Sequence, residues 1–231
     1  MGRGTDWARL EAECLELIED FNSPANLGKI YATIAGIYSD TGFTSKDVQL
    51  PKTIEYAKKA LEYPLDVPTK CHMYGRWADV LIVKALRGPQ EDMVEKRREA
   101  IVPILQGLKL ALDYNAPKEM PKPLAVDLFT LRGDINSPAN QKMLKKHEEQ
   151  VAARKKADFL ETLYFKRESL MRKCITLYSQ KPYDTNELID FASKILSKRK
   201  DVVEELVSEL RAAIAEKEQS NPPRPPAEQE S

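Results

Sequence analysis

Glycine and cysteine are scarce in this sequence, and neither sign of charge is in excess. The 231 residues include 9 glycines and 3 cysteines, and 36 Lys and Arg balance 36 Asp and Glu. Few glycines, together with the lack of alternating runs of Val, Ile and Thr, argue against β-sheets. A net charge of zero excludes the strongly basic footprint typical of nucleic-acid-binding proteins and the polybasic patch of membrane-surface proteins. We therefore expect no nucleic acid and no membrane among the partners.

Long apolar runs are also lacking. None approaches the roughly 20 residues that a membrane-spanning helix needs. No charged-then-apolar leader opens the sequence, so we expect a cytoplasmic location, and a leader removed upstream of Met1 stays open as an alternative. The three cysteines, Cys14, Cys71 and Cys174, are far apart and odd in number, and each has apolar neighbours. This pattern favours reduced packing residues over disulfides or metal ligands.

The pentapeptide NSPAN occurs twice, at Asn22–Asn26 and at Asn136–Asn140. Ser followed by Pro before a helical pattern predicts a helix start. The Ser or Asn side chain caps free backbone N–H groups, and proline at the first helical position loses no hydrogen bond. The residues after the two copies diverge, so we interpret NSPAN as a shared capping solution and not as a repeat unit.

Apolar residues at three- and four-residue spacing, separated by Pro and Gly breaks, predict helices along most of the sequence. The expected ranges are Asp6–Phe21, Pro24–Ser39, Pro51–Tyr63, Pro68 or Thr69 to Leu86, Gln90–Tyr114, Pro138–Gln180, Asp184 or Thr185 to Ser197, and Lys200–Glu218. Pro103 is expected to kink or split the fifth helix near Ile101. The sixth helix would be about 65 Å long. Its first half has no apolar stripe, so we expect that half to be solvent-exposed or to pair with another chain.

These elements divide the sequence into four expected regions. Residues 1–114 form a helical repeat region, and residues 115–137 form a proline-rich linker packed on the helices. Residues 138–218 form a long helix plus a two-helix C-terminal region, and residues 219–231 form a disordered proline-rich tail. The expected fold class is all-α.

Two helix pairs recur with a period of about 50 residues, which is typical of stacked helical hairpins. Leu27, Gly28 and Tyr31 align with Trp77, Ala78 and Leu81, and the run from Ala60 to Tyr63 aligns with the run from Ala111 to Tyr114. These residues resemble the tetratricopeptide repeat, which has a large-small-x-x-Tyr element on its first helix and a small residue on its second. The family's period is about 34 residues, and its aromatic position holds Ala57 and Leu108 here. The resemblance implies tetratricopeptide-like (TPR-like) stacked helical hairpins followed by a long helix and C-terminal helices.

The resemblance also implies a site for a partner. In the family, the first helix of each pair lines a concave surface that binds peptides. Alignment places Lys29 and Thr33 on that surface in the first pair, and Arg76 and Asp79 in the second. We expect these four to be partner-binding residues. Simple exposure, or ion pairs within the fold, stays open as the alternative.

No catalytic or metal-binding set is evident. Neither His72 nor His147 has a second ligand at helical spacing. His72 follows Cys71, and adjacent helical residues point to different faces, so we expect His72 on the surface. The basic pairs between residues 145 and 173 alternate with acids, which favours solvated helix surface over a strip of phosphate contacts.

We therefore expect a non-enzymatic helical scaffold that binds a protein or peptide partner and needs no cofactor and no metal. One alternative is a structural protein that forms a homo-oligomer through the long helix. The other is a small-molecule binder or enzyme with a pocket between helix layers.

Overall fold

The computed structural model describes residues 7–42, 49–114, 138–180, 184–197 and 200–220. These residues form eight α-helices and a 3-10 turn and no strand, which confirms the all-α prediction. The elements are α1 (Trp7–Asp20), α2 (Pro24–Gly42), α3 (Leu50–Leu61), α4 (Val67–Arg87), η1 (Gln90–Asp92), α5 (Met93–Asp113), α6 (Pro138–Tyr178), α7 (Thr185–Leu196) and α8 (Lys200–Ser220). The predicted linker over 115–137, and the predicted tail beyond Ser220, lie outside the described residues.

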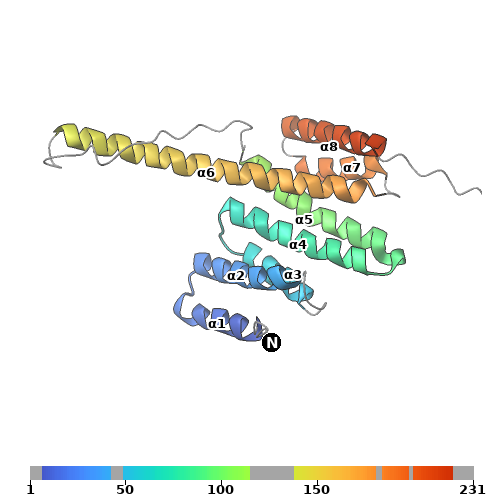
Figure 1. Ribbon diagram of the computed structural model, residues 1–231, viewed down its shortest axis with the longest axis horizontal. Helices are drawn as coiled ribbons and strands as arrows, with labels where there is room; N and C mark the ends of the chain where they lie inside the picture. Colours follow the sequence, from blue (N-terminus) through green and yellow to red (C-terminus); the bar gives the residue numbers. More distant parts are fainter. Residues whose placement is uncertain (1–6, 43–48, 115–137, 181–183, 198–199, 221–231) are drawn as a thin grey trace, which may run out of the picture.

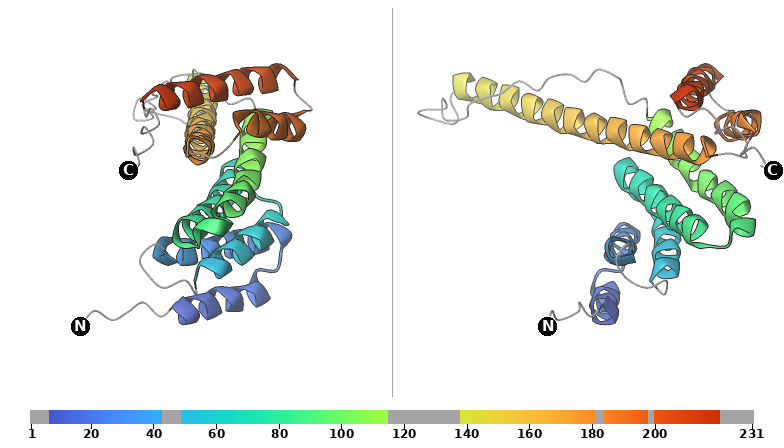
Figure 2. Two further views of the ribbon diagram at one scale, coloured as in Figure 1. Left: turned by 90° about the vertical axis from the view of Figure 1, so that its right-hand side faces the viewer. Right: turned by 45° about the vertical axis from the view of Figure 1, so that its right-hand side comes forward.

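Consecutive helices pack against one another in layers (Figure 1). α1 lies on α2, α2 on α3, α3 on α4, α4 on α5, and α5 on α6. α7 and α8 form a last pair, with α7 on α5 and α8 on α6 (Figure 2). The second half of α6 therefore lies between the α4–α5 pair and α8.

The helix starts follow from local capping chemistry. α2 begins at Pro24, and the Ser23 hydroxyl accepts a hydrogen bond from the Asn26 N–H at 3.3 Å, as the first NSPAN copy predicts. α6 begins at Pro138 in the second copy, and its Ser137 lies outside the described residues. The fourth helix starts earlier than predicted. The Asp66 side chain accepts from the Thr69 N–H at 2.7 Å and so begins α4 at Val67.

Of the kink or split predicted at Pro103, the split is wrong. α5 continues through Pro103 from Met93 to Asp113. A proline inside a helix costs roughly 3 kcal/mol, because it removes one backbone hydrogen bond and crowds the preceding turn. Ile101, Ile104 and Leu105 around it are at most 2% exposed. Burial of each is worth about 1.5–3 kcal/mol, so packing outweighs the loss at the proline.

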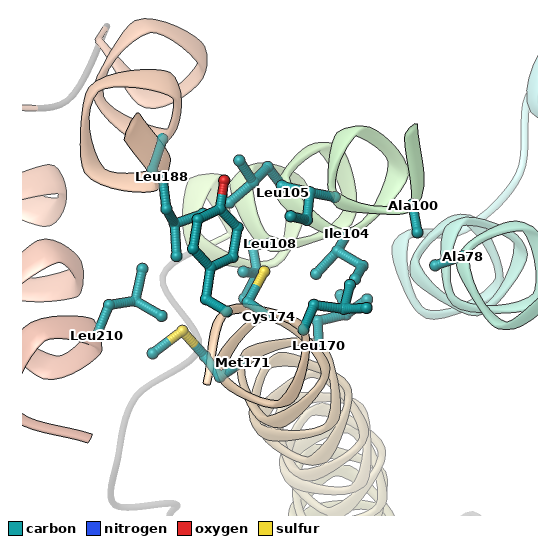
Figure 3. Packing of buried hydrophobic residues seen from close by; sticks show 14 of the residues in the cluster. Ala78, Ala100, Ile104, Leu105, Leu108, Leu170, Met171, Cys174, Leu188 and Leu210 are labelled. Atoms are coloured by element: carbon teal, nitrogen blue, oxygen red, sulfur yellow. The ribbon is translucent and has the colours of Figure 1, made fainter. Parts of the chain in front are cut away.

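The largest hydrophobic cluster joins the C-terminal helices to α4 and α5 (Figure 3). In this cluster Leu105, Leu108, Cys174, Leu188 and Leu210 are each fully buried, and they come from α5, α6, α7 and α8. The apolar stripes predicted for α8 and for the second half of α6 supply many of its members. A second cluster joins α1, α2, α3 and α4, and Trp77 of α4 packs against both clusters. The stack is thus continuous from α1 to α8.

The first half of α6 extends beyond the other helices (Figures 1 and 2). Its described side chains are exposed in the single chain; they are Pro138, Gln141, Lys142, Lys145, Lys146, Glu149, Ala152 and Asp158. Such exposure is common to both branches of the prediction, solvent exposure and pairing with another chain.

A partly buried network of hydrogen bonds attaches α1 to α2 and α3. The Glu11 carboxylate of α1 accepts hydrogen bonds from the hydroxyls of Tyr38 and Tyr56 and from the Lys52 ammonium. Burial alone raises the pKa of Glu11, but the bonds from Lys52, Tyr38 and Tyr56 outweigh it and hold the pKa below its ordinary value. α1 has no buried side chain of its own, so this network is a main part of its attachment.

Two glycines of α2 form a matched test of the packing. A Cβ on Gly28 would meet Tyr63 Cβ and Leu65 Cδ2 at 2.9 Å, whereas a Cβ on Gly36 would lie 3.5 Å from the Arg76 guanidinium, an ordinary contact. Gly28→Ala is expected to lower the free energy of unfolding by about 1–3 kcal/mol through overpacking. Gly36→Ala is expected to raise it by about 0.5–1 kcal/mol through helix propensity. Urea denaturation measures both, and equal effects would contradict this packing.

The attachment of α1 is expected to weaken in acid. The pKa of Glu11 is lowered from an ordinary value of 4.5. Its carboxylate therefore stabilises the fold above that pH, and this stability is lost as the pH falls through the folded-state pKa. Trp7 of α1 packs on the second cluster, so its fluorescence in a Trp77→Phe background should shift to the red below about pH 4.5. Glu11→Gln should show the shifted emission already at pH 7; an acid transition kept unchanged in that variant would contradict the role of Glu11.

Candidate functional site

A hollow on the surface of the described residues lies between α4, α5 and α6. Its volume is about 550 Å³. Its lining comes from three helices: Ile82, Ala85 and Leu86 of α4, Arg97 of α5, and Phe165, Glu168, Ser169, Arg172, Lys173, Thr176 and Leu177 of α6, with Gln180 beyond it. We call this hollow the α4–α6 groove. Leu86 and Phe165 at its edge are 60% and 61% exposed, so two large apolar side chains from different helices face solvent beside one groove.

Helical periodicity places these side chains. Leu163, Leu170, Cys174 and Leu177 of α6 form the face buried against the neighbouring helices. Phe165, Ser169, Arg172 and Thr176 follow one another at spacings of four, three and four residues, so they share the adjacent face, and all four line the groove. Burial of the leucine and cysteine face fixes the rotation of α6 about its axis. The face that carries Phe165 and Arg172 is therefore directed toward the groove.

The groove carries more positive than negative charge. Arg97, Arg172 and Lys173 line it, against one carboxylate, Glu168. The Glu168 carboxylate already accepts from Arg167 at 3.3 Å. Arg172 is exposed, and within the described part of the chain it forms no ion pair. An arriving acidic group thus finds an available guanidinium beside the exposed Phe165.

A smaller pocket of about 170 Å³ adjoins the groove, between α4 and α6, and shares Ser169 and Lys173 with it. We call it the cationic pocket. Its α4 side carries His72, Gly75, Arg76 and Asp79, and its α6 side carries Lys166, Ser169 and Lys173. Two lysines, an arginine and a histidine therefore line the pocket together with one carboxylate, that of Asp79.

Hydrogen bonds orient the cations of the pocket. The Lys173 ammonium donates to the Asp79 carboxylate at 2.7 Å and to the Gly75 carbonyl at 3.3 Å. Arg76 donates from Nη1 to the Gly36 carbonyl of α2 at 3.0 Å. The Lys166 ammonium lies 2.5 Å from Nδ1 of His72. Asp79 thus fixes Lys173, while Arg76 ties the pocket to α2.

Lys166 is the least compensated of these cations. Burial lowers its pKa first, and the neighbouring charges of Lys173 and Arg76 lower it further. Asp79 acts in the opposite direction. Within the residues that the structure describes, no carboxylate lies at ion-pair distance from its ammonium. Both main causes disfavour the charged form of the lysine.

The structure brings two of the four predicted partner-binding residues together. Arg76 and Asp79 lie in the cationic pocket, where both are engaged by neighbouring groups. Lys29 and Thr33 are exposed on α2 and line neither the groove nor the pocket, and the Thr33 hydroxyl donates to the Lys29 carbonyl at 2.9 Å. The alternative of ion pairing within the fold is therefore seen for Asp79.

The structure adds to one sequence interpretation and corrects another. His72 was expected on the surface and is partly exposed; with the buried Cys71 it lines the cationic pocket, which the packing of α6 against α4 creates. The basic residues of α6 were expected to be solvated. Lys166 and Lys173 instead line the pocket, and Arg167 is buried and donates to Glu209 of α8 at 2.9 Å. A signal for the two lysines exists in the sequence, since a seven-residue spacing places them on one helix face.

The cysteines act as packing residues in the described part of the chain, where no disulfide joins them. The Cys71 thiol donates to the Gly107 carbonyl at 3.5 Å, and burial raises its pKa to about 11. Burial likewise raises the pKa of Cys174. Neither thiol has the lowered pKa that activates a nucleophilic cysteine.

Metal-binding groups and membrane spans were also sought among the described residues. No three His, Cys, Asp or Glu side chains there are grouped to hold a metal ion. None of the helices there is both long enough and apolar enough to cross a bilayer. No family model, no curated protein and no solved structure matches the chain. The tetratricopeptide resemblance therefore stays a prediction.

The electrostatics of the cationic pocket can be measured on Lys166. Its ammonium is expected to titrate below the ordinary lysine pKa of 10.5, because burial, Lys173 and Arg76 all disfavour its charge. Asp79→Asn should lower its pKa further, since Asp79 favours the charged form. Reductive methylation with ¹³C-formaldehyde and NMR titration follows each lysine. A Lys166 that titrates at or above 10.5 would contradict the arrangement of charges.

Proposed function

We propose that this protein is a non-enzymatic helical scaffold that binds a partner protein through the α4–α6 groove. The occupant is a short acidic amphipathic helix of that partner. The observation that carries the proposal is the exposure of Leu86 and Phe165, 60% and 61%, on either side of a groove of about 550 Å³.

Apolar burial would supply most of the affinity. Phe165 and Leu86 come from α6 and α4, so one apolar side chain inserted between them contacts both helices and the Ile82 and Ala85 floor. Helix-in-groove recognition relies on such anchors at spacings of three and four residues. The groove residues from Phe165 to Thr176 cover about 16 Å of α6, which suits about three turns of a bound helix.

The positive charge of the groove favours an acidic ligand. Arg97, Arg172 and Lys173 exceed the single Glu168 among the lining residues. An acidic face on the ligand complements them, and a basic face is repelled. A second hollow of about 500 Å³, between α5 and α7, is lined by Glu95, Glu99, Glu187 and Asp190 against Arg98 and Lys194. Acidic side chains outnumber basic ones in that hollow, so an acidic helix should prefer the α4–α6 groove to it.

Selection from a displayed library of random helical peptides on the full chain tests the proposal. The expected result is enrichment of peptides with net negative charge and apolar residues at i, i+3 or i+4, and i+7. Leu86→Ala with Phe165→Ala should weaken the selected peptides by about tenfold or more, because each truncation removes an apolar anchor. Arg172→Glu should weaken them further and reduce their dependence on salt.

The control variant is Lys146→Ala on the exposed first half of α6, which should leave affinity unchanged. The groove variants should unfold at the same urea concentration as the parent protein, since Leu86 and Phe165 are largely exposed. Peptides without an acidic bias, or peptides that bind the Leu86→Ala, Phe165→Ala variant as tightly, would overturn the proposal.

A further inference from the structure

Lys166 is a half-buried lysine whose surroundings disfavour its positive charge. Burial, Lys173 and Arg76 each lower the pKa of its ammonium. The Arg76 guanidinium stays positive whatever hydrogen bonds it makes, because arginine is not deprotonated in proteins, so this repulsion does not depend on its partners. The carboxylate of the pocket, Asp79, accepts from Lys173 at 2.7 Å. A larger share of Lys166 than of an exposed lysine is therefore a neutral amine at neutral pH.

A second base lies directly beside this amine. The Lys166 nitrogen is 2.5 Å from Nδ1 of His72. Two protonated nitrogens cannot form a hydrogen bond with each other, because each is then only a donor, so one of the two side chains accepts. A neutral amine has two N–H groups and one lone pair, so it donates to Nδ1 and keeps the lone pair for a reaction. The pocket thus combines a nucleophile with a group that takes up its proton.

The neighbouring charges distinguish among the products that a lysine amine forms. A protonated imine keeps the positive charge on the nitrogen, an amide carries no charge, and a carbamate carries a negative charge. Lys173 and Arg76 repel a positive Lys166, so they attract a negative group at the same place. Reaction with CO₂ therefore replaces two unfavourable interactions by two favourable ones. Asp79 acts in the opposite direction, but it is already paired with Lys173.

The pocket suits a small uncharged reactant and an anionic product. Its volume of about 170 Å³ is below the roughly 300–1,000 Å³ of sites for drug-sized ligands. The Lys173 ammonium has three N–H donors and uses two, toward Asp79 and the Gly75 carbonyl. Ser169 also lines the pocket, one helical turn from Lys166 on the same face of α6. Lys173 and Ser169 therefore supply donors for the carbamate oxygens.

We propose that Lys166 is a modification site at which dissolved CO₂ forms a carbamate, with Lys173 and Ser169 as donors to its oxygens. The lone pair of Lys166 Nζ attacks the carbon of CO₂ and forms an N–C bond, while the π electron pair of one C=O bond moves to its oxygen. The nitrogen then loses a proton to Nδ1 of His72, which passes it to water. No oxidant, reductant or leaving group is involved. The proposal does not depend on binding at the α4–α6 groove.

NMR of the full chain with ¹³C-bicarbonate, in equilibrium with CO₂ at pH 7.5, tests the site. About one exposed lysine in a thousand is neutral at this pH, so few other lysines contribute. The terminal α-amino group reacts as well, so the carbamate resonance of Lys166 is the one that Lys166→Arg removes. Lys146→Arg, at an exposed position on the same helix, should leave that resonance unchanged. Lys173→Met should weaken it severalfold, because a donor and a positive charge are lost.

Chemical trapping locates the carbamate in the parent protein and so does not require that any variant folds. Triethyloxonium ion converts the carbamate to a stable ethyl ester, and mass spectrometry of the peptides identifies the lysine that carries it. Occupancy at Lys166 is expected to exceed that at Lys146 by at least tenfold. Equal occupancy at the two lysines, an absence of the ester at Lys166, or a carbamate spectrum unchanged in Lys166→Arg would overturn the proposal.

Discussion

Burial of the second half of α6 against α4 and α5 is the interaction on which the rest of this structure depends. Leu163 and Cys174 are fully buried there, and Leu170 is 2% exposed. At about 1.5–3 kcal/mol for each fully buried large apolar side chain, this face fixes the rotation of α6 about its axis. That rotation turns Lys166 and Lys173 toward α4 and leaves Phe165 and Arg172 beside the groove. The second half of α6 also packs against α8, where the buried Arg167 guanidinium donates to the Glu209 carboxylate.

The cationic pocket is a consequence of this packing that does not favour stability. Lys166 is half-buried beside Lys173 and Arg76, and its pKa falls because burial and these neighbours disfavour its charge. By contrast, the Glu11 network on α1 places one carboxylate among a lysine and two tyrosine hydroxyls, and every partner there stabilises the charged form. Each hydrogen bond to Glu11 thus favours its charged form, whereas two of the cations beside Lys166 disfavour the charge of that lysine.

Sequence periodicity predicts the helices of this protein better than it predicts the site. The apolar stripes of α6 and α8 and the cap at Ser23 follow from spacing and local chemistry, and the structure shows them. The split predicted at Pro103 does not occur, because burial of the neighbouring side chains outweighs the cost of the proline, and that burial is a tertiary property. Lys166 and Lys142 look alike in the sequence, yet one lines a pocket and the other is exposed. Arg76 and Asp79 were expected on an open concave surface; α6, from outside the aligned repeats, packs over that face.

Hydrogen exchange of the backbone amides tests the packing of α6 most directly. If residues 163–178 are packed against α4, α5 and α8, their amides open only with most of the fold, while the amides of the exposed segment 141–152 open locally. The account predicts exchange at least about a hundredfold slower in 163–178 than in 141–152, equivalent to about 2.7 kcal/mol. Equal exchange along the whole of α6 would show that its second half is not docked, and neither the groove nor the cationic pocket would then exist.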